Sequence, residues 1–170
     1  MSRILVVYYS RTGTTRQVGE SITAALRSDS EEIVEATGRG GKLGYLRSLF
    51  EAMLKVPSRI VAARQDPSNY DLVVIGTPVW AWSVSSPIRT YLAANKPRLS
   101  AVALFCTMGG AGSGRAFAQM QELAGQRPAA CLAIKAGDVA LANYGPELEA
   151  FVEALQQRLP SQPDRTTNAA

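Results

Sequence analysis

The sequence has no histidine, only two cysteines and no apolar run long enough to cross a membrane. Without histidine, the usual general base of triad hydrolases and the commonest transition-metal ligand are missing. Because Cys106 and Cys131 lie far apart in the chain, a zinc site is also disfavoured. Both fall in strand-like runs, which predicts reduced, buried thiols in a cytoplasmic protein. The first apolar run follows only Arg3 and has no small-residue cleavage site, so we expect no signal peptide.

Length and composition are those of an ordinary globular α/β protein, with 170 residues and 46% hydrophobic content. We expect one domain over residues 1–160 and a disordered polar tail over 161–170. The net charge is +4, and basic side chains gather between residues 38 and 64. This segment is either a solvated face or a docking surface for an acidic partner or an anionic substrate. It lacks interleaved stacking aromatics, which disfavours nucleic acid. The basic residues are Arg39, Lys42, Arg47, Lys55, Arg59 and Arg64.

Strand-like and helix-like segments alternate five times along the chain, which predicts a parallel sheet with helices on both faces. The expected strands contain Ile4–Tyr9, Glu31–Ala36, Leu72–Ile75, Ala101–Cys106 and Cys131–Ala136. The expected helices carry apolar stripes at Val18, Ile22, Ala25 and Leu26; at Leu46, Leu49, Phe50, Met53 and Leu54; at Ile88, Tyr91 and Leu92; at Phe117, Met120 and Leu123; and at Leu148, Phe151, Val152, Leu155 and Leu159. Ser86 with Pro87 is a typical helix start, and Gly145-Pro146 opens the last helix.

The composition of the strands predicts their order. Strands one, three and four are continuously apolar, as strands covered on both faces should be. Strands two and five carry charge and are expected at the edges. The order 2-1-3-4-5 in a three-layer α-β-α sandwich satisfies both conditions, and it brings the loops after strands one, three and four to one rim. Such sheets bind ligands at the switch point, here between strands one and three.

The loop after the first strand has the composition of an anion site. Ser10, Thr12, Thr14 and Thr15 offer hydroxyl groups, and Gly13 lets the backbone approach a ligand. The helix that follows begins with N–H groups that have no intrahelical partner, and its dipole favours negative charge there. A turn whose Ser and Thr residues only cap the helix is the alternative. The loop has neither Gly-x-Gly-x-x-Gly nor Gly-Lys-Ser/Thr, which argues against a dinucleotide-first Rossmann site and an NTPase.

Three segments, residues 9–15, 76–82 and 106–112, resemble the FMN-binding loops of flavodoxin-like proteins, and the resemblance extends over roughly residues 2–159. It implies that the first loop holds the FMN phosphate, that the second borders the isoalloxazine with a stacking indole, and that the third presents backbone to the pyrimidine side of the ring. The first loop would contribute Ser10, Arg11 (at the variable position of the pattern), Thr12, Gly13, Thr14 and Thr15. The second would contribute Thr77, Pro78, Val79, Trp80, Ala81 and Trp82, and the third Thr107, Met108, Gly109, Gly110 and Gly112.

The resemblance implies an FMN-binding flavoprotein that acts in electron transfer or as an oxidoreductase, with a redox protein, a quinone or NAD(P)H as its partner. No side chain stands out as a proton donor, and the sequence leaves a homodimer open. The basic charge departs from flavodoxins proper, which are strongly acidic. A flavodoxin-like interaction module without cofactor is the alternative. A receiver domain is disfavoured because Tyr9-Ser10 and Gly76-Thr77 stand where it needs acidic residues. A phosphatase built on Cys106 would need arginine at the position of Gly112.

Overall fold

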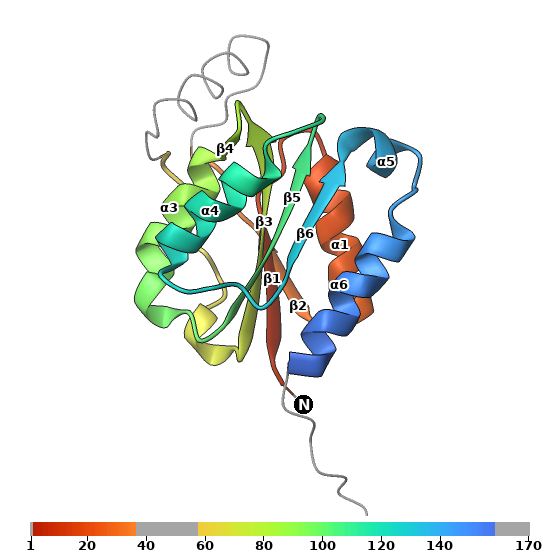
Figure 1. Cartoon of the computed structure of the whole chain (residues 1–170). Helices are drawn as coiled ribbons and strands as arrows, with labels where there is room; N and C mark the ends of the chain where they lie inside the picture. Colours follow the sequence, from red (N-terminus) through yellow and green to blue (C-terminus); the bar gives the residue numbers. More distant parts are fainter. Residues whose placement is uncertain (1, 37–57, 159–170) are drawn as a thin grey trace, which may run out of the picture.

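The computed structural model describes residues 2–36 and 58–158, and the sheet at its centre follows the predicted order (Figure 1). Its parallel strands run in the order β2-β1-β3-β5-β6. A two-residue strand, β4, pairs antiparallel with the end of β3 and adds a sixth strand that the sequence did not predict. The strands are β1 (Ile4–Tyr8), β2 (Asp29–Glu32), β3 (Leu72–Trp80), β4 (Ser83–Val84), β5 (Val102–Met108) and β6 (Cys131–Lys135).

Two helical layers cover the sheet. On one face lie α1 (Thr14–Leu26), the short α5 (Ala136–Ala140) and α6 (Gly145–Arg158); on the other lie α3 (Ser86–Asn95) and α4 (Ser113–Ala124) (Figure 1). Two short 3-10 turns, Pro67–Asn69 and Lys96–Arg98, precede β3 and β5. Each layer buries a separate apolar cluster against the sheet. Within the described residues, no helix has the length and apolar content to span a membrane.

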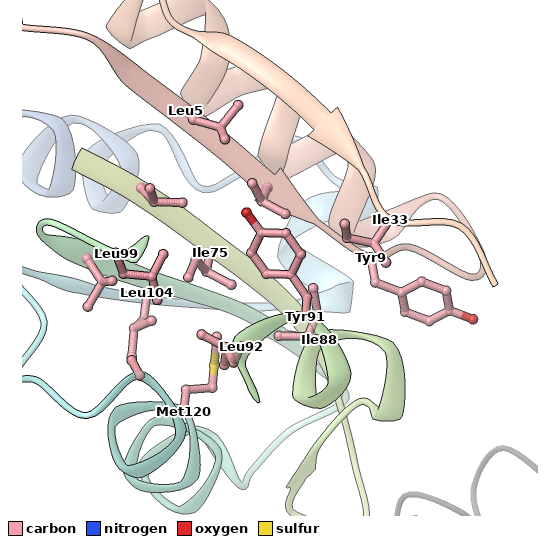
Figure 2. Close-up of a cluster of buried hydrophobic side chains, with 14 of the residues drawn as sticks. Leu5, Tyr9, Ile33, Ile75, Ile88, Tyr91, Leu92, Leu99, Leu104 and Met120 are labelled. Carbon is pink, nitrogen blue, oxygen red and sulfur yellow. The ribbon is translucent and has the colours of Figure 1, made fainter. Parts of the chain in front are cut away.

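The cluster beneath α3 and α4 shows how the predicted stripes are used (Figure 2). Ile88, Tyr91 and Leu92 of α3 are fully buried, and they pack with Met120 of α4 against the central strands. Leu5, Ile75 and Leu104, one from each of β1, β3 and β5, form the sheet side. Full burial of a side chain of this size contributes about 1.5–3 kcal/mol to folding. The burial of these apolar residues therefore stabilises the packing of α3 and α4 on the sheet.

Several predicted boundaries and exposures are wrong in detail. β2 spans Asp29–Glu32 rather than residues 31–36, because Asp29 and Ser30 already pair with β1. Ala25 of the α1 stripe is exposed, whereas Val18 and Ile22 are buried as predicted. Cys131 is exposed rather than buried, because it begins an edge strand; Cys106 is buried as expected. The following calls lie outside the described residues: the helix around Leu46–Leu54, Arg39, Lys42, Arg47 and Lys55 of the basic segment, Leu159, and the tail 161–170.

The start of α3 also differs from the prediction. Ser85, not Ser86, stands at the N-cap position, and in the described structure it makes no side-chain capping bond. Its backbone N–H donates to the hydroxyl of Thr77 at 3.0 Å, and the two hydroxyl oxygens also lie 3.0 Å apart. Both residues are completely buried. The α3 start is therefore tied to β3 by a side-chain pair instead of being capped.

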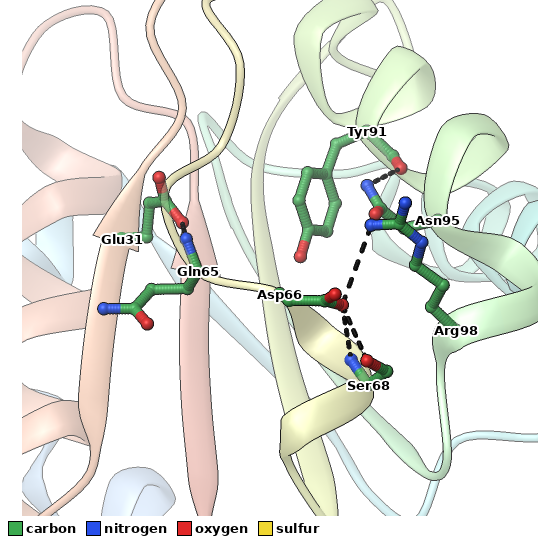
Figure 3. Close-up of polar contacts among 7 residues, drawn as sticks. All are labelled: Glu31, Gln65, Asp66, Ser68, Tyr91, Asn95 and Arg98. Atoms are coloured by element: carbon green, nitrogen blue, oxygen red, sulfur yellow. Dashed lines mark hydrogen bonds and ion pairs between the residues drawn. The ribbon is translucent and has the colours of Figure 1, made fainter.

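The segment that leads into β3 is held by carboxylates (Figure 3). Glu31 of β2 accepts hydrogen bonds from the backbone N–H groups of Arg64 and Gln65, at 2.5 and 2.9 Å. Asp66 accepts from the N–H and the hydroxyl of Ser68, at 3.0 and 2.8 Å, and lies 3.6 Å from the guanidinium of Arg98. These bonds to Ser68 lower the pKa of Asp66. They fix residues 64–68 between the edge strand and the start of β3.

Candidate functional site

A pocket of about 380 Å³ lies where the loops after β1 and β5 meet the end of β3. It brings together eleven of the seventeen residues that the sequence analysis selected: Arg11, Thr12, Thr14, Thr15, Pro78, Val79, Trp80, Ala81, Thr107, Met108 and Gly109. Six selected residues do not line it: Ser10, Gly13, Thr77, Trp82, Gly110 and Gly112. One lining residue was missed, Ala136 at the start of α5. The strand order could have indicated it, because Ala136 directly follows β6, the neighbour of β5.

The first wall of the pocket is the N-terminus of α1. Gly13 occupies the N-cap position in a left-handed conformation, with φ +93°. Its N–H donates to the hydroxyl oxygen of Ser10 at 3.2 Å, and the hydroxyl oxygens of Thr12 and Thr14 lie 3.4 Å apart. Among the described residues no side chain caps α1, and its first turn contains no acidic residue. The hydroxyl groups therefore do not serve as caps, and the first-turn N–H groups are left to face a ligand.

Thr15 joins this wall to β5. Its hydroxyl oxygen lies 2.7 Å from that of Thr107 in β5, and both side chains are buried. This bond is buried and connects residues 92 positions apart. It holds the first turn of α1 at a fixed distance from the end of β5, so both loops meet the pocket in one arrangement.

The second wall is the end of β3, which the sequence analysis expected to be a loop. Strand pairing with β4 extends β3 to Trp80, and Trp80 lines the pocket. Its ring stands edge-on to that of Tyr9, with centroids 6.1 Å apart and an interplanar angle of 90°. The Tyr9 hydroxyl donates to Glu35 at 3.1 Å, and burial together with this carboxylate raises the pKa of Tyr9. Trp80 therefore rests on a buried, neutral tyrosine.

The two tryptophans have different places. Trp82 is 58% exposed and does not line the pocket. It packs on Gly112, where an added Cβ would lie 2.6 Å from Trp82 Cδ1. Gly112 also has φ +110°, so the fold itself requires glycine at this position. Thr77 is likewise structural, since its side chain is buried beside Ser85.

The third wall is the end of β5 and the loop after it, where Thr107, Met108 and Gly109 line the pocket and Gly110 follows them. An added Cβ at Gly109 or Gly110 would meet no atom within 4 Å, so packing in the described structure does not require glycine at either position. A pair of glycines in open space leaves the backbone accessible to a close ligand. Among the lining residues that the structure describes, Arg11 alone is charged. A pocket with uncapped helix N–H groups, hydroxyls, an arginine and no acidic side chain among its described lining residues suits an anion attached to a flat aromatic group.

Comparison with known proteins shows the family of the chain. A family model for flavodoxin matches residues 3–139. A flavoprotein of Lactobacillus acidophilus, solved in complex with FMN, is 26% identical over 83% of this chain and 98% of that chain, with a TM-score of 0.70. A protein of Bacteroides eggerthii is 23% identical over 89% and 98% of the two chains (TM-score 0.71), and oxidised flavodoxin 2 of Bacillus cereus is 16% identical over 93% and 100% (TM-score 0.58).

No curated protein matches the chain significantly. The family match nevertheless extends from β1 into α5, and so includes the strands and the pocket-lining residues that the structure describes. The chain belongs to the flavodoxin family.

Proposed function

We propose that the chain binds one FMN in the pocket between the α1 N-terminus and the end of β3, and that it works as a flavoprotein in electron transfer or as an oxidoreductase. The observation that carries this proposal is the uncapped first turn of α1 beside Thr12 and Thr14. Support also comes from the Lactobacillus flavoprotein, whose structure contains FMN and whose chain this one matches at 26% identity.

The residues present fit FMN in both charge and shape. A phosphate dianion would gain from the α1 N–H groups and from Thr12, Thr14 and Thr15, with no acidic residue among the described lining. The ring system would lie between the wall formed by Pro78 to Ala81 and the wall formed by Thr107 to Gly109. The volume of about 380 Å³ lies within the usual range of about 300–1,000 Å³ for small-molecule sites.

Bound FMN supplies the redox chemistry, by accepting a hydride or single electrons. The chain then has to bind the cofactor, orient it and set its surroundings. Among the described lining residues only Arg11 is ionisable, and arginine stays protonated, so the pocket wall contains no general acid. The thiol of Cys106 packs behind Val79, and burial raises its pKa to about 12. We therefore assign the protein a role in binding and electrostatics rather than in proton transfer.

An FMN titration tests this proposal. The FMN-free protein is titrated with FMN, and binding is followed by flavin fluorescence and by calorimetry; we expect one FMN per chain. Riboflavin is the control because it has the ring system without the phosphate. We expect riboflavin to bind on the order of 100-fold more weakly, a difference of about 2.7 kcal/mol. A protein that stays colourless and does not respond to FMN would instead be an interaction module without cofactor.

A second measurement separates the two kinds of redox function. FMN-loaded protein is mixed without oxygen with NADH or NADPH, and oxidation of the nucleotide is followed with and without an added quinone. Nucleotide oxidation that depends on the quinone supports a reductase. FMN that is reduced only through a protein reductase supports an electron carrier.

A further inference from the structure

The β3–β4 hairpin, which carries part of the pocket wall, ends in an unfavourable turn. Val79 pairs with Val84 and Trp80 with Ser83, so Ala81 and Trp82 alone form the connection. Both have positive φ, 48° and 56°. Two-residue hairpin loops of this kind strongly prefer asparagine, aspartate or glycine. Since alanine and tryptophan are strained in this conformation, contacts outside the turn must hold it.

A partly buried polar cluster provides such contacts, with Gln119 of α4 at its centre. The side-chain oxygen of Gln119 accepts hydrogen bonds from the Ser83 hydroxyl at 2.9 Å and from the Val84 N–H at 3.2 Å. It also accepts one from the Arg89 guanidinium of α3 at 3.0 Å. Both residues of β4 are therefore attached to α4 through a single amide oxygen.

Arg89 is the unusual member of this cluster. Its residue exposure is 9%, and its Nη2 donates to Ser83 at 3.1 Å as well as to Gln119. In the part of the chain that the structure describes, Arg89 forms no ion pair, and its buried Nε has no hydrogen-bond partner. Burial lowers the pKa of Arg89, and the negative charge of Glu122 only partly offsets this by raising it. A buried guanidinium that forms no ion pair within the described residues is costly, so its hydrogen bonds have to offset that cost.

We propose that Arg89 is a positioning residue for the pocket: together with Gln119 it clamps Ser83 and Val84, and so holds Trp80 and Ala81 in the conformation that borders FMN. The clamp acts through the hairpin and does not touch the pocket, because Ser83, Arg89 and Gln119 are all absent from its lining. It preorganises one wall, so binding does not have to order the turn. The effect on FMN rests on the function proposed above, whereas the clamp itself exists in the FMN-free protein.

The test is a double-mutant cycle between Arg89 and the turn. Arg89→Met removes the two hydrogen bonds that Arg89 donates within the clamp, and we expect the Kd for FMN to rise about tenfold. In an Ala81→Asn background the turn is intrinsically favoured, so the same Arg89→Met change should raise Kd by less than about threefold. In the FMN-free protein, hydrogen exchange of the Val84 amide should be at least about tenfold faster in Arg89→Met, while exchange of the Val74 amide in central β3 changes much less.

Arg98→Met is the matched control, because it removes the same charge from an exposed position whose guanidinium lies 3.6 Å from Asp66 (Figure 3). Its Kd for FMN should stay within about twofold of wild type. If Arg89→Met does not fold, Ser83→Ala, which removes one partner of both Arg89 and Gln119, is measured in the same way.

Equal effects of Arg89→Met in both backgrounds, or unchanged Val84 exchange, would overturn the clamp. Failure of the wild-type protein to bind FMN would overturn the proposed function but leave the exchange result standing.

Discussion

A carboxylate at position 14 should stabilise the FMN-free protein and weaken FMN binding at the same time. Thr14 is the first residue of α1, whose first turn has no acidic side chain and, in the described structure, no side-chain cap. Thr14→Asp adds a negative charge at the positive end of the helix dipole, worth about 0.3–1 kcal/mol. The melting temperature of the FMN-free protein should therefore rise by a few degrees.

The same charge opposes a phosphate dianion. At a separation of about 5 Å and an effective dielectric constant of about 20–80, two unit charges repel by about 0.8–3.3 kcal/mol. A dianion doubles this, so the loss is at least about 1.7 kcal/mol, and the Kd for FMN should rise at least about 15-fold. Because the site is partly open to water, added salt should reduce the loss.

Thr14→Asn is the matched control. It removes the same hydroxyl and its 3.4 Å contact with Thr12 without adding charge. The two variants are compared by FMN titration and by thermal unfolding without FMN. A lower melting temperature for Thr14→Asp than for Thr14→Asn would contradict the dipole argument. Equal FMN affinity in the two variants would mean that the phosphate does not lie at the start of α1.

Three further predictions concern the support of the pocket. Thr15→Val leaves the buried hydroxyl of Thr107 without its 2.7 Å partner, so urea denaturation should show a loss of about 1–3 kcal/mol in the free energy of unfolding, partly recovered when Thr107 is also valine. Gly76→Ala places a Cβ in the ring of Phe105, and the melting temperature should fall by an amount equivalent to about 1–3 kcal/mol. Burial raises the pKa of Cys106 from 9.0 to about 12. The unfolded thiol therefore ionises first, and stability should fall as pH rises above about 9; urea midpoints should decline less steeply in Cys106→Ala.

The sheet order was predictable because strands that are buried on both faces have continuously apolar sequences. β1 and β3 are buried over all or nearly all of their length. In contrast, β2 carries three acidic residues and is exposed or half-buried throughout, and the buried positions of β6 alternate with more exposed ones. The end of β3 was not predictable in the same way. Glycine and proline at positions 76 and 78 suggested a loop, but pairing with β5 continues the strand through both positions, and pairing with β4 extends it to Trp80. A partner strand of two residues has no periodicity that a sequence can reveal.

The sequence predicted which loops meet at the site, but not which of their side chains face the pocket. Strand order alone brings Thr12, Trp80 and Gly109 to one rim, and the structure places all three in the lining. Sequence could not show that Trp82 would turn away onto Gly112, because this depends on two consecutive left-handed residues. Nor could it show the clamp, since Arg89 and Gln119 are 30 residues apart and neither belongs to a motif.

Two walls of the pocket share one physical property. The local backbone structure of each is unfavourable, and contacts elsewhere in the fold stabilise it. The start of α1 lacks the cap and the acidic first turn that stabilise most helix N-termini. It is held by the buried side chains of Val18 and Ile22 and by the Thr15–Thr107 bond. The turn at Ala81 is strained, and β4 holds it through the Gln119 amide. Groups that the fold leaves unsatisfied are the groups that remain for a ligand to satisfy. A substitution that satisfies them within the chain, such as Thr14→Asp, should therefore stabilise the empty protein at the expense of binding.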